Sequence, residues 1–145
     1  MVMVDVKSKQ VRALAQKLTP DIVQFLRDLI AEHSESTGEQ GVVARVRREM
    51  EKVGFDEIKI DGFGNILGRV GNGKRVIAMD AHLDTVGVGD PTTWRCDPFK
   101  GDLKDGVIYG RGASDMKAGM AAMVYGAKIL KDLDLLGDFQ LWITG

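Results

Sequence analysis

Hydrophobic residues recur at helical spacing in two early segments of the chain. The first stripe consists of Ile22, Val23, Phe25, Leu26, Leu29 and Ile30. It follows Thr19, Pro20 and Asp21, which suit the N-cap, the first position and the first turn of a helix. The second stripe consists of Val42, Val43, Val46, Met50 and Val53, and it precedes Gly54. The pattern predicts a helix that starts at Thr19 and a second amphipathic helix that ends at Gly54.

From residue 55 onward the pattern changes to short β-prone runs at residues 57–60, 65–70, 75–80, 107–109 and 139–144. Residues 71–74 (Gly-Asn-Gly-Lys) and the pair Asp105-Gly106 have turn chemistry, so we expect each to link two antiparallel strands locally. Residues 76–79 show no polar alternation, which predicts a central strand covered on both faces.

A third apolar stripe predicts a long helix over about residues 116–133; it consists of Met116, Met120, Met123, Ala127 and Leu130. Because helices both precede and interrupt the strands, the sequence predicts an α/β fold, a layered mixed sheet with helices on both faces. No internal repeat, low-complexity tract or proline-rich linker divides the 145 residues, and no second domain is visible.

Composition and charge exclude several classes of protein. The chain is 44% hydrophobic and 28% charged, and 20 basic residues against 21 acidic ones leave a net charge of -1. These values are typical of a soluble globular protein and favour neither a nucleic-acid nor a membrane partner. The lone Cys96 cannot form an internal disulfide, and the first ten residues lack the apolar run of a signal peptide. We therefore expect a cytoplasmic protein.

A histidine and an acid, His82 and Asp84, follow directly after the most apolar strand. Open α/β sheets bind their ligands at this end of their strands. Neutral imidazole is a good zinc ligand, and a ligating histidine commonly donates its other ring N–H to a carboxylate. The simpler interpretation is that His82 ends a strand and Asp84 caps a turn, and an isolated His-x-Asp motif favours that interpretation.

Asp115 lies in a glycine-containing segment, residues 109–117 (Tyr-Gly-Arg-Gly-Ala-Ser-Asp-Met-Lys), between a predicted strand and a predicted helix. An acid at a helix N-terminus is favourable without any metal, so an ordinary N-cap is one interpretation. The other is a metal ligand, since a carboxylate has two oxygens and can bridge two cations about 3.5–4 Å apart.

Several motifs occur together in one order. Residues 82–86 (His-Leu-Asp-Thr-Val) are followed by Trp94, residues 97–99 (Asp-Pro-Phe), Gly106 and residues 109–117. This order resembles the co-catalytic zinc peptidases and deacylases, a family that includes acetylornithine deacetylase, succinyl-diaminopimelate desuccinylase, aminoacylase and several di- and tripeptidases. The resemblance covers the chain from about residue 19 to residue 145. Residues 87–109 are also similar to the branch of these hydrolases linked to selenium metabolism.

The resemblance implies that His82 ligates one zinc, that Asp115 bridges two zincs and that Asp84 orients His82. It implies two zinc ions per completed site, with cobalt or manganese as substitutes. It also implies a zinc exopeptidase-like catalytic domain, of which residues 1–145 form the N-terminal part. The implied reaction is hydrolysis of an amide bond in a small peptide or an N-acyl amino acid.

The family's other site residues have no counterpart in this sequence. In the family, a general-base glutamate and a neighbouring acidic ligand follow a strand that resembles residues 139–144, and this sequence ends at Gly145. Another carboxylate ligand, a last histidine and a smaller domain are also absent. A catalytic zinc usually has three protein ligands plus water, so we expect the 145-residue chain alone to be inactive. Ala118 stands where the family commonly has a second glycine, a change that we expect to be tolerated.

The alternative is a non-catalytic fragment or degenerate relative that binds metal weakly or needs a second chain. We also expect an exposed apolar edge at the last strand, which would favour self-association. A serine-nucleophile triad of Ser114, His82 and Asp84 is disfavoured because Ser114 lies outside a G-x-S-x-G elbow.

The remaining candidate residues are given structural roles. The glycines around Arg111 lack the third glycine of a dinucleotide-binding motif, and we expect Arg111 to clamp backbone carbonyls or a neighbouring acid. Cys96 has no cysteine or histidine near it in the sequence, so we expect an incidental thiol. His33 is expected to be a surface residue on a loop remote from the metals.

Overall fold

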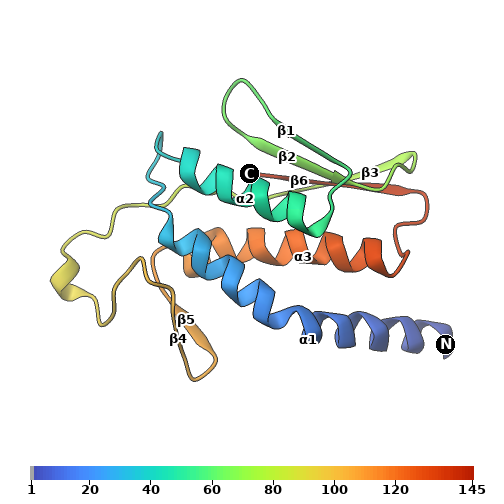
Figure 1. Ribbon diagram of the computed structural model, residues 1–145, viewed down its shortest axis with the longest axis horizontal. Coiled ribbons are helices and arrows are strands. Elements are labelled where there is room, and N and C mark those ends of the chain that lie inside the picture. Colours follow the sequence, from blue (N-terminus) through green and yellow to red (C-terminus); the bar gives the residue numbers. More distant parts are fainter. Residues whose placement is uncertain (1) are drawn as a thin grey trace.

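The computed structural model describes residues 2–145 (Figure 1). Its helices are α1 (Val2–Ala31), α2 (Gln40–Val53) and α3 (Ala118–Asp132), with short turns η1 (Pro91–Thr93) and η2 (Ala113–Lys117). Its strands are β1 (Glu57–Ile60), β2 (Ile66–Val70), β3 (Arg75–Asp80), β4 (Asp102–Lys104), β5 (Val107–Tyr109) and β6 (Phe139–Thr144). Each β-prone run of the sequence is therefore a strand, and residues 102–104 form one more.

The first helix starts far upstream of the predicted N-cap. Thr19 and Pro20 lie inside α1, and the Thr19 hydroxyl donates to the carbonyl of Ala15 at 3.1 Å. Pro20 removes one backbone donor from the helix. The residues before it are mostly lysine, glutamine, arginine, alanine and leucine, which are strong helix formers, so the helix continues through the proline. The predicted start at Thr19 is wrong.

The second helix has the predicted C-terminus. Gly54 adopts a left-handed conformation with φ 85°, and its N–H bonds the carbonyls of Met50 and Glu51. A residue other than glycine would be strained there, which explains why the helix ends at this position.

Four strands form a mixed sheet in the order β1-β2-β6-β3, in which β6 is antiparallel to β2 and parallel to β3. Residues 71–74 therefore do not link adjacent strands, as the sequence predicted, but cross over the start of β6. Gly73 passes so close to this strand that a Cβ on it would lie 2.1 Å from the carbonyl carbon of Asp138. The predicted hairpin at Asp105 and Gly106 is confirmed, because both residues have positive φ between β4 and β5.

Strand β3 lies at the sheet edge, and each of its residues is exposed to solvent in the part of the chain that the structure describes. The prediction that residues 76–79 form a central, covered strand is therefore wrong for this structure. The central position belongs to β6, so the exposed edge expected at the last strand lies at β3 instead. The apolar composition of residues 76–79 predicted a strand, but it could not predict where that strand lies in the sheet.

Helices α2 and α3 pack on one face of the sheet, and α1 packs on the other two helices (Figure 1). A single buried cluster joins Val46 and Met50 of α2, Met120 and Val124 of α3, and Ile66, Leu141 and Ile143 of the sheet. The layered α/β class is confirmed, although the three helices of residues 2–145 leave the other face uncovered. Among these residues, no helix is both long enough and apolar enough to span a bilayer.

Candidate metal centre

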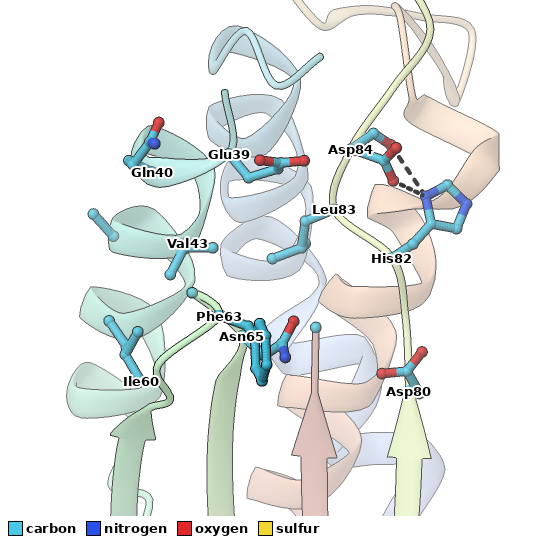
Figure 2. A pocket seen from close by; sticks show the side chains of 13 residues that line it. Glu39, Gln40, Val43, Ile60, Phe63, Asn65, Asp80, His82, Leu83 and Asp84 are labelled. Carbon is cyan, nitrogen blue, oxygen red and sulfur yellow. Dashed lines mark hydrogen bonds and ion pairs between the residues drawn. The ribbon is translucent and has the colours of Figure 1, made fainter. Parts of the chain in front are cut away.

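The segment after β3 carries the two candidate residues on one side. Beyond Asp80 buried and outward side chains alternate, as they do along an extended chain. Ala81, Leu83 and Thr85 are buried, whereas the intervening His82 and Asp84 face outward (Figure 2). The buried residues fix the backbone, and the side chains of His82 and Asp84 remain accessible to a ligand.

His82 lies between two carboxylates. Its Nδ1 lies 3.1 Å from Asp84 Oδ1 (Figure 2), and its Nε2 lies 2.9 Å from Asp115 Oδ1. The hydrogen bond with Asp115 raises the pKa of His82 above its ordinary value, and bonds to Asp84 add to this shift. The side chains of His82 and Asp115 are 45% and 87% exposed, so their donor atoms are accessible from solvent.

Asp115 does not cap the helix that follows it. It lies in the turn η2 with φ -124° and ψ 99°, and α3 begins three residues later at Ala118. The peptide bond between Asp115 and Met116 is cis. The ordinary N-cap interpretation is therefore wrong, and the predicted helix start at residue 116 is two residues early. The Asp115 carboxylate instead meets His82, from a residue 33 positions away in the sequence.

The loop that carries His33 contacts the site segment. The Ser36 hydroxyl donates to Asp84 Oδ2 at 2.8 Å, and this bond is the main cause that lowers the pKa of Asp84. Ser34 is buried and donates to the carbonyl of Leu83 at 2.8 Å. The expectation that this loop lies remote from the site is wrong. His33 itself is exposed and stacks on Phe99 at 3.6 Å between ring centroids, as expected of a surface residue.

Lys117, like Ser34 and Ser36, is a residue that the sequence analysis did not single out. Its side chain is buried, and its Nζ donates to the carbonyls of Leu29 at 2.7 Å and Glu32 at 2.8 Å. Burial lowers the pKa of Lys117 to about 8. Only its place two residues after Asp115 could have drawn attention to it, because its partners are backbone groups distant in sequence.

The donor set fits part of a metal site. Imidazole nitrogen and carboxylate oxygen are both zinc ligands, and His82 Nε2 and Asp115 Oδ1 are close enough to face one ion. Within residues 2–145, however, no group of three or more histidine, cysteine, aspartate or glutamate side chains is arranged to hold a metal. These residues therefore offer two ligands, fewer than the three that a catalytic zinc usually takes from protein.

A cavity of about 470 Å³ adjoins His82 (Figure 2). Its walls come from α2, from the loop between β1 and β2 and from the chain after β3; its lining residues include Val43, Ile60, Phe63, Leu83, Glu39, Asp80 and Asp84. Lysine and arginine are absent from the described lining, so the cavity combines apolar walls with carboxylates.

Three other candidates have no part in this arrangement. The Arg111 guanidinium lies 5.0 Å from the Trp94 ring centroid and its backbone N–H donates to Pro98, but its buried Nε has no hydrogen-bond partner, so Nε does not form the expected clamp on a carbonyl or an acid. The hydrogen bonds that the structure gives His82 go to Asp84 and Asp115, and none goes to Ser114. Cys96 is a half-buried free thiol.

Comparison with known proteins decides the family. Residues 78–145, which contain His82, Asp84 and Asp115, match the family described as Peptidase family M20/M25/M40. This part of the chain is therefore similar to peptidase family M20/M25/M40. The resemblance to a family of peptidases and deacylases, inferred from sequence motifs, is thereby confirmed.

Two relatives are similar to most of the chain. The chain is 51% identical over 131 residues to "Uncharacterized protein YgeY" of Escherichia coli (strain K12), covering 90% of this chain and 32% of that protein. It is 34% identical over 113 residues to succinyl-diaminopimelate desuccinylase of Xanthomonas campestris pv. campestris (strain B100), covering 77% and 30%. The chain thus spans about a third of the length of these relatives.

Solved structures share the fold of this chain. The dipeptidase Dug1p of Saccharomyces cerevisiae superposes with a TM-score of 0.81 at 18% identity, covering 94% of this chain and 33% of that one. Human carnosine dipeptidase 1 superposes with a TM-score of 0.77 at 19% identity, covering 96% and 34%. At these identities the likeness shows the fold alone.

Proposed function

We propose that residues 1–145 are the N-terminal part of the catalytic domain of a dinuclear zinc hydrolase that cleaves amide bonds of small peptides or N-acyl amino acids. The meeting of His82 and Asp115 at 2.9 Å carries this proposal, because two residues 33 positions apart present zinc-ligand atoms at one point. The family match and the name of one relative, a desuccinylase, support the substrate class.

Each site residue has a defined task in this proposal. His82 Nε2 and Asp115 would hold the metals, and Asp84 would hold the other ring nitrogen so that Nε2 is presented for binding. When bound, the metal pair supplies a Lewis acid for the substrate carbonyl and lowers the pKa of a bound water. Cobalt or manganese would serve the same oxygen and nitrogen ligands. The cavity beside His82 is where a substrate group would lie.

The remaining ligands and the general base must come from residues other than these 145. Two ligands cannot complete a pair of catalytic zinc sites. The exposed apolar residues of β3, with Val76 61% exposed, support a further contact at this edge. We propose that the rest of a longer protein, a second chain or a second copy supplies the missing ligands, the general base and the contact at this edge.

A non-catalytic role is the second candidate. It is favoured by the absence, within the described residues, of any group of three side chains arranged to hold a metal. In that case the chain is a weak metal binder without turnover.

A calorimetric zinc titration of the 145-residue chain tests the metal site when it is run with His82→Ala, Asp115→Ala and His33→Ala. His33→Ala is the matched control, because His33 is the only other histidine and stacks on Phe99 instead of meeting a carboxylate. The same samples are tested for hydrolysis of pooled N-acyl amino acids and dipeptides.

We expect weak zinc binding that falls at least about tenfold with His82→Ala or Asp115→Ala and stays unchanged with His33→Ala, without turnover. Equal binding by all four proteins would contradict the metal site. Two tightly bound zincs with turnover would contradict the incomplete site and show that the chain or its oligomer forms a whole one.

A further inference from the structure

One stretch of the chain contacts both segments that carry the proposed metal ligands. This stretch, residues 29–36, comprises the last residues of α1 and the loop after it, and is called the α1 anchor below. In Figure 1 it lies where α1 meets the chain after β3 and the turn before α3. The two ligand-bearing segments come from different parts of the sequence, so a shared support could set the distance between them.

The loop of the α1 anchor holds the segment that carries His82. The N–H of Thr85 donates to the Ser34 carbonyl at 2.7 Å, and the Ser34 hydroxyl donates to the Leu83 carbonyl at 2.8 Å. These two bonds fix the backbone on the buried side of the segment. On its outward side, the Ser36 hydroxyl donates to Asp84 Oδ2, while the other oxygen, Oδ1, meets His82 Nδ1.

Ser36 therefore fixes the rotation of the Asp84 carboxylate. A carboxylate bound through one oxygen to a histidine can still turn about its side-chain bonds. A hydroxyl on the second oxygen restricts that rotation, so the chain Ser36, Asp84, His82 helps to hold the imidazole plane, together with the Asp84 carbonyl, which also lies 3.1 Å from His82 Nδ1. The other ring nitrogen, Nε2, then points at Asp115.

The helical end of the α1 anchor holds the turn that carries Asp115. Lys117 donates from its buried Nζ to the carbonyls of Leu29 and Glu32, groups that the end of a helix otherwise leaves without partners. An ammonium at a helix C-terminus is also favoured by the helix dipole. Because Lys117 is two residues from Asp115, this attachment fixes the turn to the same support that fixes His82.

We propose that the α1 anchor is a positioning device for the metal centre, which sets the spacing of His82 and Asp115 through Ser36 and Lys117. The inference rests on the proposed metal site. Ser36 and Lys117 touch neither substrate nor metal in this proposal; they act through Asp84 and through the Asp115 turn. Ligands that are already ordered lose less conformational freedom on binding, so an intact anchor tightens metal binding.

The test compares zinc affinity at one pH for the wild-type chain, Ser36→Ala, Ser36→Thr, Lys117→Met and a control, Thr92→Ala. Thr92 donates its hydroxyl to Asp90 at 2.8 Å, the same length as the Ser36 to Asp84 bond, and Asp90 contacts neither proposed ligand in the structure. The second readout is the tautomer of His82 in the metal-free chain, from ring ¹⁵N chemical shifts at a pH where the ring is neutral.

We expect Ser36→Ala to weaken zinc binding by about threefold to tenfold and to give a mixture of the two His82 tautomers. Ser36→Thr should restore the wild-type zinc affinity and the wild-type tautomer. Lys117→Met should weaken binding by a similar factor while His82 keeps its tautomer, and Thr92→Ala should change nothing. Zinc affinity and a His82 tautomer unchanged in Ser36→Ala would overturn the inference, whether or not Lys117→Met folds. If the wild type binds no zinc, the proposed metal site fails, and the tautomer of Ser36→Ala still decides whether Ser36 orients His82.

Discussion

Gly112 lies against residues of both ligand-bearing segments. This residue has φ 76°, and a Cβ on it would lie 2.7 Å from Thr85 Cγ2 and 3.1 Å from Lys117 Cδ. Thr85 follows His82 and Asp84, and Lys117 follows Asp115, so Gly112 is the residue around which both parts of the site pack. Both its conformation and its surroundings require the absence of a side chain.

Gly112→Ala should lower the free energy of unfolding by about 1–3 kcal/mol, through positive φ and contact with Thr85. Gly126→Ala is the matched control, because Gly126 lies inside α3 with nothing within 4 Å of its Cβ position. There we expect a gain of up to about 1 kcal/mol, since alanine favours a helix over glycine. Urea unfolding of the three proteins measures both changes, and equal effects of the two substitutions would refute this account.

Individual site residues were predictable from sequence to different degrees. His82, Asp84 and Asp115 were found because they lie in recognisable motifs after a strand and before a helix. Ser36 and Lys117 were not, because their partners lie 48 or more positions away in the sequence. A hydrogen bond between distant segments depends on how the elements pack, and local pattern carries no record of that.

At the scale of elements, Glu49 joins the three helices. It lies on α2 with 1% of its surface exposed and accepts hydrogen bonds from Tyr125 of α3 and from Arg45, which also pairs with Asp28 of α1. Burial alone would raise the pKa of Glu49, but the bonds from Tyr125 and Arg45 outweigh it and hold the pKa below its ordinary value of 4.5.

A lowered folded-state pKa makes stability depend on pH in one direction. The ionised Glu49 stabilises the fold above about pH 4.5, and this contribution is lost as pH falls through the folded-state pKa. Glu49→Gln should therefore cost about 1–3 kcal/mol at pH 7 and reduce the loss of stability toward acid pH.

The control for this substitution is Glu51→Gln, also on α2. Glu51 pairs with Arg47 at the surface, where both side chains are more than half exposed, so we expect a change below about 1 kcal/mol. Thermal unfolding of both variants between pH 3 and pH 7 gives the comparison. An acid dependence of Glu49→Gln identical to that of the wild type would contradict the assignment.

Periodicity predicted which segments are helices and which are strands. It predicted the ends of the elements and the order of the strands less accurately. The C-terminus at Gly54 was predictable because a left-handed residue is a local property. The start of α1 was not, because helix-forming residues upstream overrode the proline signal at Pro20. The order β1-β2-β6-β3 was also beyond the pattern, since β6 enters between two strands that adjoin in sequence.

At the scale of the whole molecule, the helices do not cover the full width of the sheet, and the β3 edge is left exposed. Ile77 and Met79 of β3 pair with Leu141 and Ile143 of β6, so they lie on the face that the helices cover elsewhere. They are nevertheless 44% and 42% exposed, because α2 and α3 stop short of this edge. An apolar edge strand with open backbone donors and acceptors is a site where further chain can pair.

This edge should make the 145-residue chain self-associate, and one charge on it should reduce that association. Val76→Lys places an ammonium on β3, where it opposes strand pairing, and we expect association to weaken by about tenfold or more, equivalent to about 1.4 kcal/mol. Val107→Lys is the control, because Val107 is also an exposed valine, 49% against 61%, but lies in the separate β4–β5 sheet. Sedimentation velocity over a concentration series distinguishes the variants. A wild-type chain that stays monomeric, with β3 amides protected from hydrogen exchange, would show that this edge is closed within the chain itself.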